Sequence, residues 1–345
     1  MTGDLILMAH GSGGKLSQDL VEHLFVRHFD NPTLLELGDS AVLPIPDAQS
    51  PLPRTRLAFS TDSYVVSPLF FPGGDIGKLA VCGTVNDLSM SGAKPLWLSA
   101  GFIIEEGLPL AELERVVASM ASTAQSSGVQ FVTGDTKVVD KGSADKLFIN
   151  TAGVGLLPPG IEIAGDRAQP GDIVILSGTI GDHGMTIMTQ REGLRFDSPL
   201  ESDCAPLNGM VADLLAAVPP GSIHCLRDPT RGGLATTLNE LAGRSGVGIE
   251  IHETSVPIRD EVRAACELLG LDPFYVANEG KLIAIVAPET AEVALASLQA
   301  HRFGRRAAVV GWVDEAHTGR VVLRTALGAR RVVDVLVGEQ LPRIC

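Results

Sequence analysis

Apolar strand-like runs alternate with amphipathic helices along the 345-residue chain, and this alternation restricts the folds open to it. Residues 110–125, for example, would form a helix with one apolar face made by Leu113, Val116, Val117, Met120 and Ala124. We predict helices at about residues 16–29, 76–91, 110–125, 206–217, 230–243, 259–269 and 289–301. We predict strands at about residues 57–66, 96–104, 129–133, 147–157, 172–177, 281–286, 308–314 and 320–325. This order of elements predicts layered α/β or α+β domains.

The length of the chain favours two domains rather than one. Pro158-Pro159-Gly160 interrupts the pattern, and a second series of strands and helices follows it. We therefore expect an N-terminal domain over residues 1–158 and a C-terminal domain over residues 159–334.

Residues 335–345 form a tail that ends in a cysteine. Gly338 and Pro342 disfavour a regular helix there, and a fully extended tail of this length would reach at most roughly 36 Å. The terminal Cys345 is either a frayed end without a role or a thiol on an arm that carries a group between sites.

The charge balance excludes several classes of partner. Lys and Arg number 27 and Asp and Glu number 41, so the net charge is −14, which repels phosphate backbones and anionic membranes. No apolar run approaches the length of a membrane span, and the N-terminus lacks the basic region of a signal peptide. We therefore expect a cytoplasmic protein that binds neither nucleic acid nor membranes.

The five cysteines are odd in number and widely spaced, with no CxxC pair. This spacing disfavours both a disulfide framework and a structural zinc site. Cys82 and Cys266 lie in apolar stretches, where we expect buried packing residues.

Four aspartates in the first half of the chain are predicted to sit in turns or at strand ends, each beside apolar residues: Asp39, Asp62, Asp87 and Asp135. A single such aspartate is usually a cap or turn residue. Four of them suggest a cluster that would repel itself unless cations neutralise it. Oxygen ligands favour Mg²⁺ or Ca²⁺, and Mg²⁺ commonly bridges to phosphates, which would let an acidic protein bind a nucleotide.

Three further motifs have both a functional and a structural interpretation. His10–Lys15 is glycine-rich but lacks the Walker A spacing, so it is either an anion-binding lid or a structural loop. Arg227–Leu234 could bind an anion, or Asp228 or Thr230 could cap a helix. Asn278–Lys281 puts Glu279 before a buried strand, as a general base or as part of a surface turn.

Taken in order, the aspartate motifs resemble the ATP-binding superfamily of aminoimidazole ribonucleotide synthetase, which also holds selenophosphate synthetase and thiamine-monophosphate kinase. The motifs that carry this resemblance are Gly38–Ala41, Thr61–Ser63, Asn86-Asp87 with Gly92-Ala93, and Gly134–Thr136. Within the superfamily, further segments are similar to the HypE family of hydrogenase maturation proteins, and these are His10–Lys15, Phe71–Gly77, Arg227–Gly233, Asn278–Lys281 and Pro342–Cys345.

The resemblance implies a fold and a reaction. The fold is a two-domain α/β (α+β) architecture whose N-terminal sheets pair across a homodimer, with an ATP-binding and dimerisation domain at 1–158 and a flexible tail at 335–345. The reaction is an ATP-dependent carbamoyl dehydration, of the lyase class, that converts an S-carbamoyl group on Cys345 to a thiocyanate, the source of the cyanide ligands of nickel–iron hydrogenase. The implied partners are the carbamoyltransferase HypF, which loads the thiol, and the HypC–HypD complex, which receives the cyanide.

The resemblance also implies site residues. Catalytic roles fall to Cys345 as carrier, Glu279 as base, Lys137 as the cation near the transferred phosphoryl group, and His10 as a weaker candidate. The residues expected to hold ATP and Mg²⁺ are Gly11, Gly13, Gly14, Lys15, Asn86 and the aspartates Asp39, Asp62, Asp87 and Asp135, and the aspartates would be the metal ligands. Two alternatives remain: a small-molecule kinase or synthetase of the same superfamily, and a non-catalytic maturation scaffold.

Overall fold

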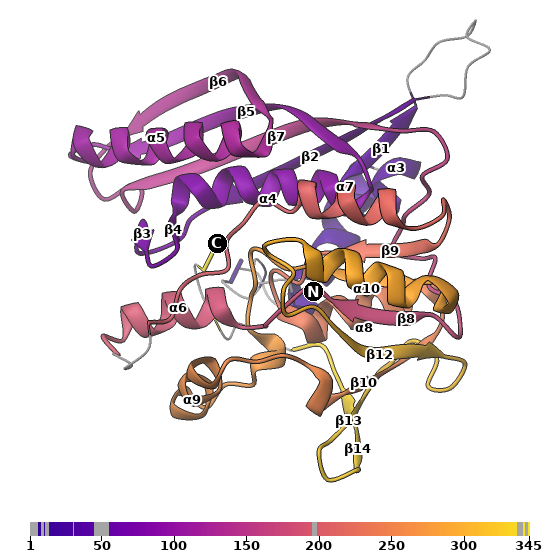
Figure 1. Ribbon diagram of the computed structural model, residues 1–345. Coiled ribbons are helices and arrows are strands. Elements are labelled where there is room, and N and C mark those ends of the chain that lie inside the picture. Colours follow the sequence, from indigo (N-terminus) through magenta and orange to yellow (C-terminus); the bar gives the residue numbers. More distant parts are fainter. Residues whose placement is uncertain are drawn as a thin grey trace, which may run out of the picture.

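Two mixed β-sheets organise the protein, one in each half of the chain (Figure 1). The computed structural model describes residues 6–7, 10, 14–29, 31–44, 55–194, 199–336, 341 and 344–345. Within these residues the strand order is β1-β2-β7-β5-β6 in the first sheet and β14-β13-β10-β12-β8-β11-β9 in the second. The predicted two-domain α/β class is thereby confirmed, whereas the domain boundaries proposed above remain predictions.

The N-terminal half contains a small two-stranded sheet besides the large one. Its strands are β1 Ala41–Pro44, β2 Arg56–Tyr64, β3 Phe70–Phe71, β4 Gly74–Asp75, β5 Lys94–Glu105, β6 Gln130–Val139 and β7 Leu147–Leu157. Its helices are α1 Lys15–Leu20, the π-helix Val21–Val26, α2 Arg27–Phe29, α3 Pro32–Leu35, α4 Ile76–Met90 and α5 Leu110–Ser127.

The C-terminal half is a sheet with helices on both faces. Its strands are β8 Ile173–Leu176, β9 Ile223–Arg227, β10 Gly248–His252, β11 Ile283–Val286, β12 Ala308–Asp314, β13 Val321–Arg324 and β14 Arg330–Val333. Its α-helices are α6 Asp182–Arg191, α7 Asn208–Ala217, α8 Gly233–Ser245, α9 Asp260–Leu269 and α10 Ala291–Ala300. The β11 strand reads Ile-Ala-Ile-Val and is wholly buried, as expected for a strand covered on both faces.

Helices cover one face of the N-terminal sheet, whereas no element among the described residues covers the other. Leu79 and Val85 of α4 pack with Leu98 and Ile149 of the sheet in one apolar cluster. Figure 1 shows α4 between this sheet and the C-terminal half. On the uncovered face, Phe59, Trp97 and Ile103 are 44%, 46% and 45% exposed. This face therefore presents large apolar side chains to its surroundings.

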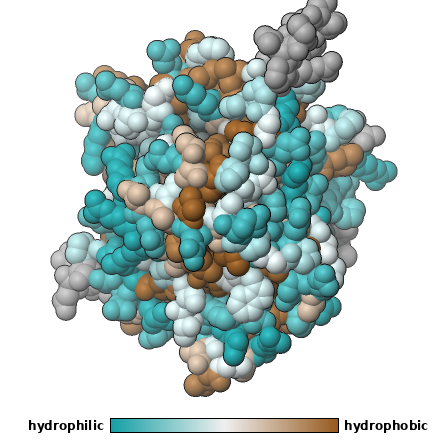
Figure 2. Space-filling model, turned by 45° about the vertical axis from the view of Figure 1, so that its right-hand side comes forward, coloured by the Kyte–Doolittle hydropathy of each residue, from teal (hydrophilic) through white to brown (hydrophobic). Residues whose placement is uncertain are grey.

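One side of the molecule is mainly polar. Figure 2 shows a face on which hydrophilic residues predominate, with apolar ones gathered in smaller groups. Among the helices of the described residues, none is both long enough and apolar enough to cross a membrane.

Several predicted elements differ from the observed ones. The strand predicted at 129–133 continues to Val139, so Gly134–Thr136 lies inside β6 and not in a turn. Asp87 lies in helix α4, also not in a turn. Helix α8 begins at Gly233 after Gly232, and neither Asp228 nor Thr230 caps it. Most of β6 is exposed, and its sequence does not alternate between apolar and polar residues, so the strand signal is weak. Asp87 lies on the face of α4 that meets the C-terminal half, where Asp228 is close to it.

The two halves meet around the buried side chain of Asn86, on α4. Its amide nitrogen donates to the carbonyl oxygens of Ala205 and Glu279 at 3.1 and 3.3 Å, and its oxygen accepts the N–H of Leu207 at 2.7 Å. One side chain thus satisfies three backbone groups of the C-terminal half, which fixes that half against α4.

Asn86→Ala should therefore lower the free energy of unfolding by about 2–4 kcal/mol, because three buried backbone groups lose their partner. Urea unfolding would measure the change. Asn208→Ala is the control, since Asn208 makes one hydrogen bond, to the Ser127 carbonyl oxygen. Equal losses in the two variants would contradict the bridging role of Asn86.

Candidate functional site

Three carboxylates from separate parts of the chain converge where the two halves meet. Asp39 precedes β1, Asp87 lies on α4, and Asp228 follows β9. One oxygen from each lies within 4.8 Å of the others. A set of three carboxylates at this spacing fits a hard divalent cation such as Mg²⁺.

The electrostatics of this cluster also favour a cation. Burial raises the pKa of Asp39 to about 8, although Arg227 opposes the shift. Burial likewise raises the pKa of Asp228 to about 6 and raises that of Asp87, which Asp228 and Asp62 raise further. Without a counter-charge the three groups resist ionising together, so a bound cation would compete with their protons.

Two arginines lie beside the carboxylates. Arg227 Nε is 2.8 Å from an oxygen of Asp39, and its Nη2 is 3.2 Å from an oxygen of Glu240. Arg231 Nη2 is 3.3 Å from an oxygen of Asp62. Asp62 therefore lies in the pocket as an ion-pair partner, outside the three-carboxylate cluster.

The terminal cysteine lies in the same pocket. Cys345 lines a cavity of about 230 Å³ together with Asp39, Asp62, Asp87 and Glu279. The N–H of Val65 donates to the terminal oxygen of Cys345 at 3.1 Å. Figure 1 places the C-terminus between α4 and α6, consistent with this position. The thiol at the chain end and the predicted metal ligands therefore share one site.

Burial controls the ionisation of the two reactive groups. It raises the pKa of the Cys345 thiol to about 12, with Arg231 lowering it and Glu279 raising it. Burial also raises the pKa of Glu279 well above its ordinary value, and Cys204 and Asp62 add to the effect. In this arrangement Cys345 is a neutral thiol, and Glu279 holds a proton more firmly than an ordinary glutamate.

Asp135 and Lys137 do not reach this pocket within one chain. Through β7 and β5, Asp62 is in register with Gly134 of β6. Successive side chains alternate between faces, so Asp135 and Lys137 lie on the face opposite to Asp62. Both are 70% exposed, and their charged groups are 3.3 Å apart. Strand register, which the sequence does not reveal, separates them from the other predicted residues.

The predicted nucleotide-binding loop and Asn86 also lie elsewhere. His10 hydrogen-bonds with the backbone of Leu7, and the backbone of Lys15 with that of Leu336. Gly14 caps α1, while Gly11 and Gly13 lie outside the described residues. The described residues of the loop, like Asn86, are absent from the lining of the carboxylate pocket. The side chain of Asn86 is bonded to backbone groups, and its predicted contact with the nucleotide stays a prediction.

Several residues that line the pocket were not predicted as site residues, and three of them are charged residues of one motif. Asp228, Arg227 and Arg231 were interpreted as a capped or anion-binding helix start, yet Asp228 completes the carboxylate cluster and Arg231 lies near the terminal thiol. The sequence did contain a signal for these site residues, because Arg-Asp-Pro-Thr-Arg places three charged residues at the end of a largely buried strand.

Comparisons with known proteins agree with this architecture. Residues 38–157 match the N-terminal domain of AIR synthase related proteins, and residues 169–324 match the C-terminal domain. The chain is 56% identical over 338 residues to the carbamoyl dehydratase HypE of Azotobacter vinelandii, covering 98% of this chain and 96% of that protein.

Two solved structures are similar over nearly all of the chain. A hydrogenase maturation protein HypE in complex with ATP has a TM-score of 0.81 at 54% identity, covering 99% of this chain and 100% of that one. A HypE–HypF complex has a TM-score of 0.85 at 48% identity, covering 92% of this chain and 99% of that one.

Stability should depend on pH through the carboxylate cluster. The folded pKa values of Asp39 and Asp228, about 8 and about 6, lie above the ordinary value, so the folded state holds more protons than the unfolded state. Without divalent cations, the free energy of unfolding should fall as the pH rises from about 5 to 8, and Mg²⁺ should restore it at pH 8.

Urea unfolding in chelator and in Mg²⁺ at several pH values would check this. Asp39→Asn should flatten the pH dependence, whereas the exposed control Asp140→Asn should not. An unchanged slope in Asp39→Asn would contradict the assignment.

Proposed function

Because the chain belongs to the HypE family of hydrogenase-maturation carbamoyl dehydratases, we propose that it uses ATP to convert an S-carbamoyl group on Cys345 to a thiocyanate. The thiocyanate would supply cyanide ligands for nickel–iron hydrogenase. One observation carries the proposal: the terminal thiol lines the same pocket as three clustered carboxylates and Glu279.

The reaction needs a better leaving group than oxide. The carbamoyl oxygen attacks the γ-phosphorus of ATP, which releases ADP and forms a C–O–P linkage while the nitrogen loses one proton. Loss of the second N–H proton and of phosphate then gives the carbon–nitrogen triple bond. The net conversion is thiocarbamate and ATP to thiocyanate, ADP and phosphate.

Glu279 is the proposed acceptor of the N–H protons. Its burial in the pocket raises its pKa, so its ionised form is a stronger base than an ordinary glutamate. Arg231, which lies near the thiol, would hold negative charge that develops on the transferred group. We assign no step to His10.

Asp39, Asp87 and Asp228 are the proposed Mg²⁺ ligands, with Asp62 beside them. When bound, Mg²⁺ would neutralise the charge of the ATP phosphates. Asp228 is thus proposed as a metal ligand in place of Asp135, which was predicted from the sequence.

The charge state of the Cys345 thiol determines where loading would occur relative to dehydration. In the pocket its pKa is about 12, so Cys345 is a poor nucleophile there. Loading by the carbamoyltransferase HypF would therefore occur with the tail outside the pocket. The similarity to a HypE–HypF complex supports HypF as the partner. Transfer of cyanide to HypC–HypD and a cytoplasmic location are further parts of the proposal.

We propose that Asp135 and Lys137 act across a homodimer. They lie on the uncovered face of the sheet, the face that also exposes Phe59, Trp97 and Ile103. Pairing of two such faces would bury these apolar side chains and bring Lys137 of one chain toward the other.

Cys345→Ala should leave folding and ATP binding intact but abolish turnover, because the carrier is lost. Mass spectrometry after carbamoylation and ATP addition should show the loss of one water on the C-terminal peptide of the wild type. The control is Cys266→Ala, since Cys266 is buried in a separate apolar cluster. Modification of another cysteine would sink the proposal, and absence of ATP-dependent dehydration would favour a scaffold.

Mixed dimers would test whether Lys137 acts between chains. Lys137→Ala and Glu279→Gln homodimers should each be inactive. A heterodimer of the two should regain about half of the wild-type activity, because one of its two sites would hold both native side chains. No recovery in a purified heterodimer would place Lys137 outside the partner's site.

A further inference from the structure

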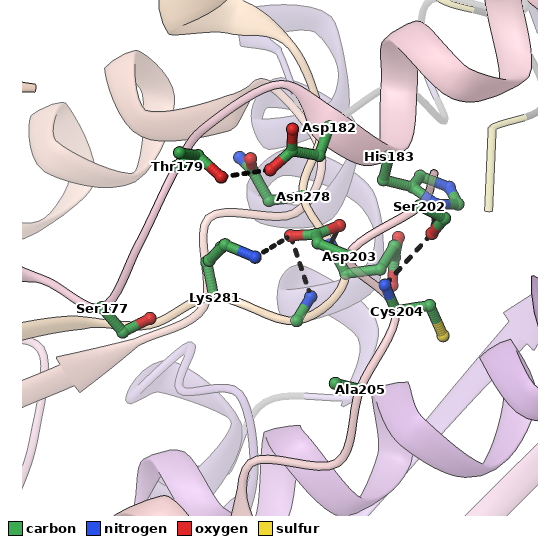
Figure 3. Close-up of polar contacts among 12 residues, drawn as sticks. Ser177, Thr179, Asp182, His183, Ser202, Asp203, Cys204, Ala205, Asn278 and Lys281 are labelled. Carbon is green, nitrogen blue, oxygen red and sulfur yellow. Dashed lines mark hydrogen bonds and ion pairs between the residues drawn. The ribbon is translucent and has the colours of Figure 1, made fainter. Parts of the chain in front are cut away.

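A short segment between α6 and α7, Ser202–Cys204, is linked through His183 to the chain end and is bonded directly to the loop that carries Glu279. Figure 3 shows Ser202 facing His183 on one side, while Asp203 faces Lys281 on the other. The N–H of Ser202 also donates to the carbonyl oxygen of Pro72 at 2.9 Å, which anchors the segment to the N-terminal half.

His183 holds the tail by a single directed hydrogen bond. The ring is fully buried on α6, and its Nε2 is 2.9 Å from the carbonyl oxygen of Ile344. Ser202 Oγ accepts the N–H of Cys204 at 3.1 Å and lies 2.7 Å from Nδ1 of the ring. The serine hydroxyl is then free to donate to Nδ1, which leaves the ring proton on Nε2 to donate to Ile344.

Asp203 holds the loop of Glu279 on the other side. Its carboxylate accepts the N–H groups of Glu279 and Gly280 at 3.1 and 3.3 Å, and Lys281 Nζ at 3.1 Å. A Cβ at Gly280 would lie 1.9 Å from the carbonyl oxygen of Asp203, so only glycine permits this approach. The buried ion pair with Lys281 keeps the carboxylate charged for this purpose.

We propose that Ser202–Cys204 is a positioning element that sets the terminal thiol and Glu279 relative to each other. His183 and Asp203 are its two positioning residues, the first for the tail and the second for the loop. His183 is bonded to Ser202, and Asp203 is the next residue in the chain, so the two points of attachment are about 3.8 Å apart at Cα. A displacement at one is therefore transmitted to the other. This inference rests on the proposed function only in taking Glu279 as the base.

A purely structural network would behave differently. Loss of its hydrogen bonds would lower stability without a specific change at the chain end. The positioning role instead predicts that Ile344 and Cys345 leave the pocket while the protein stays folded. This release can be measured without any turnover.

The first experiment measures alkylation of Cys345 by iodoacetamide in the full-length protein, followed on the C-terminal peptide by mass spectrometry. His183→Asn is too short to reach Ile344 and should raise the rate about five- to tenfold, the worth of one buried hydrogen bond. The matched control His183→Gln keeps an N–H donor near the position of Nε2 and should stay within about twofold of wild type. Equal rates in the two variants would overturn the role of His183.

The second experiment tests transmission through the segment. Asp203→Asn is combined with Lys281→Met, because a buried lysine without its partner would destabilise the fold. This double variant should lower kcat for dehydration about tenfold and leave the KM for ATP unchanged. It should also raise the rate of Cys345 alkylation several-fold, although neither substituted residue is bonded to the tail. Unchanged alkylation would overturn the coupling.

Ser202→Ala, which removes one hydroxyl, replaces the double variant if that one does not fold, and it should raise alkylation in the same way. If the wild type fails to dehydrate a carbamoylated Cys345, the proposed function fails, and the alkylation contrast still decides the role of His183.

Discussion

The clustering of three buried carboxylates at the meeting of the two halves is the constraint on which the site depends. Asp39, Asp87 and Asp228 each have one oxygen within 4.8 Å of the others; burial raises all three pKa values, and Asp228 further raises those of Asp39 and Asp87. Such groups would separate if they were free to move. They stay together because each is attached to an element fixed by packing or by hydrogen bonds that do not involve the cluster.

Asn86 shows how this is achieved. It lies next to Asp87 on α4, and its side chain bonds the backbone of Ala205, Leu207 and Glu279. The residue beside a metal-ligand candidate thus joins the two halves, and it also holds the loop of the proposed base. The hydrogen bonds of Asn86 fix α4 next to the cluster, so a cation can bind without first gathering its ligands.

The sequence predicted best the elements that have a clear apolar pattern or clear turn signals beside them. Helices α4 and α5 and strand β7 lie within two residues of the predicted ranges. Helix α5 has one apolar face, whereas α4 is buried on nearly all sides and follows the turn residues Pro72-Gly73-Gly74. Strand β6 was predicted too short, since its polar residues face outward and give no apolar alternation. Helix α6 was not predicted, because glycine and polar residues interrupt its pattern.

The sequence predicted many residues of the site but not which of them lie together. Motif resemblance led to Asp39, Asp62, Asp87 and Cys345, which the structure brings to one pocket. Asp135 has the same local setting in the sequence, yet strand register turns it to the opposite face. No property of the residues near it encodes that difference, because register is fixed by pairing with distant strands.

The acidity and burial of the pocket explain why the docked sulfur of Cys345 is held in an uncharged state. A thiolate at Cys345 would add charge beside Asp62 and Glu279, and burial makes that state costly. A carbamoylated sulfur has no proton to lose and carries no charge, so it meets no such penalty. In the proposed reaction, the tail would be loaded outside the pocket as a thiolate and would return as a neutral thiocarbamate. The electrostatics that make the docked thiol unreactive would then favour the entry of the loaded group.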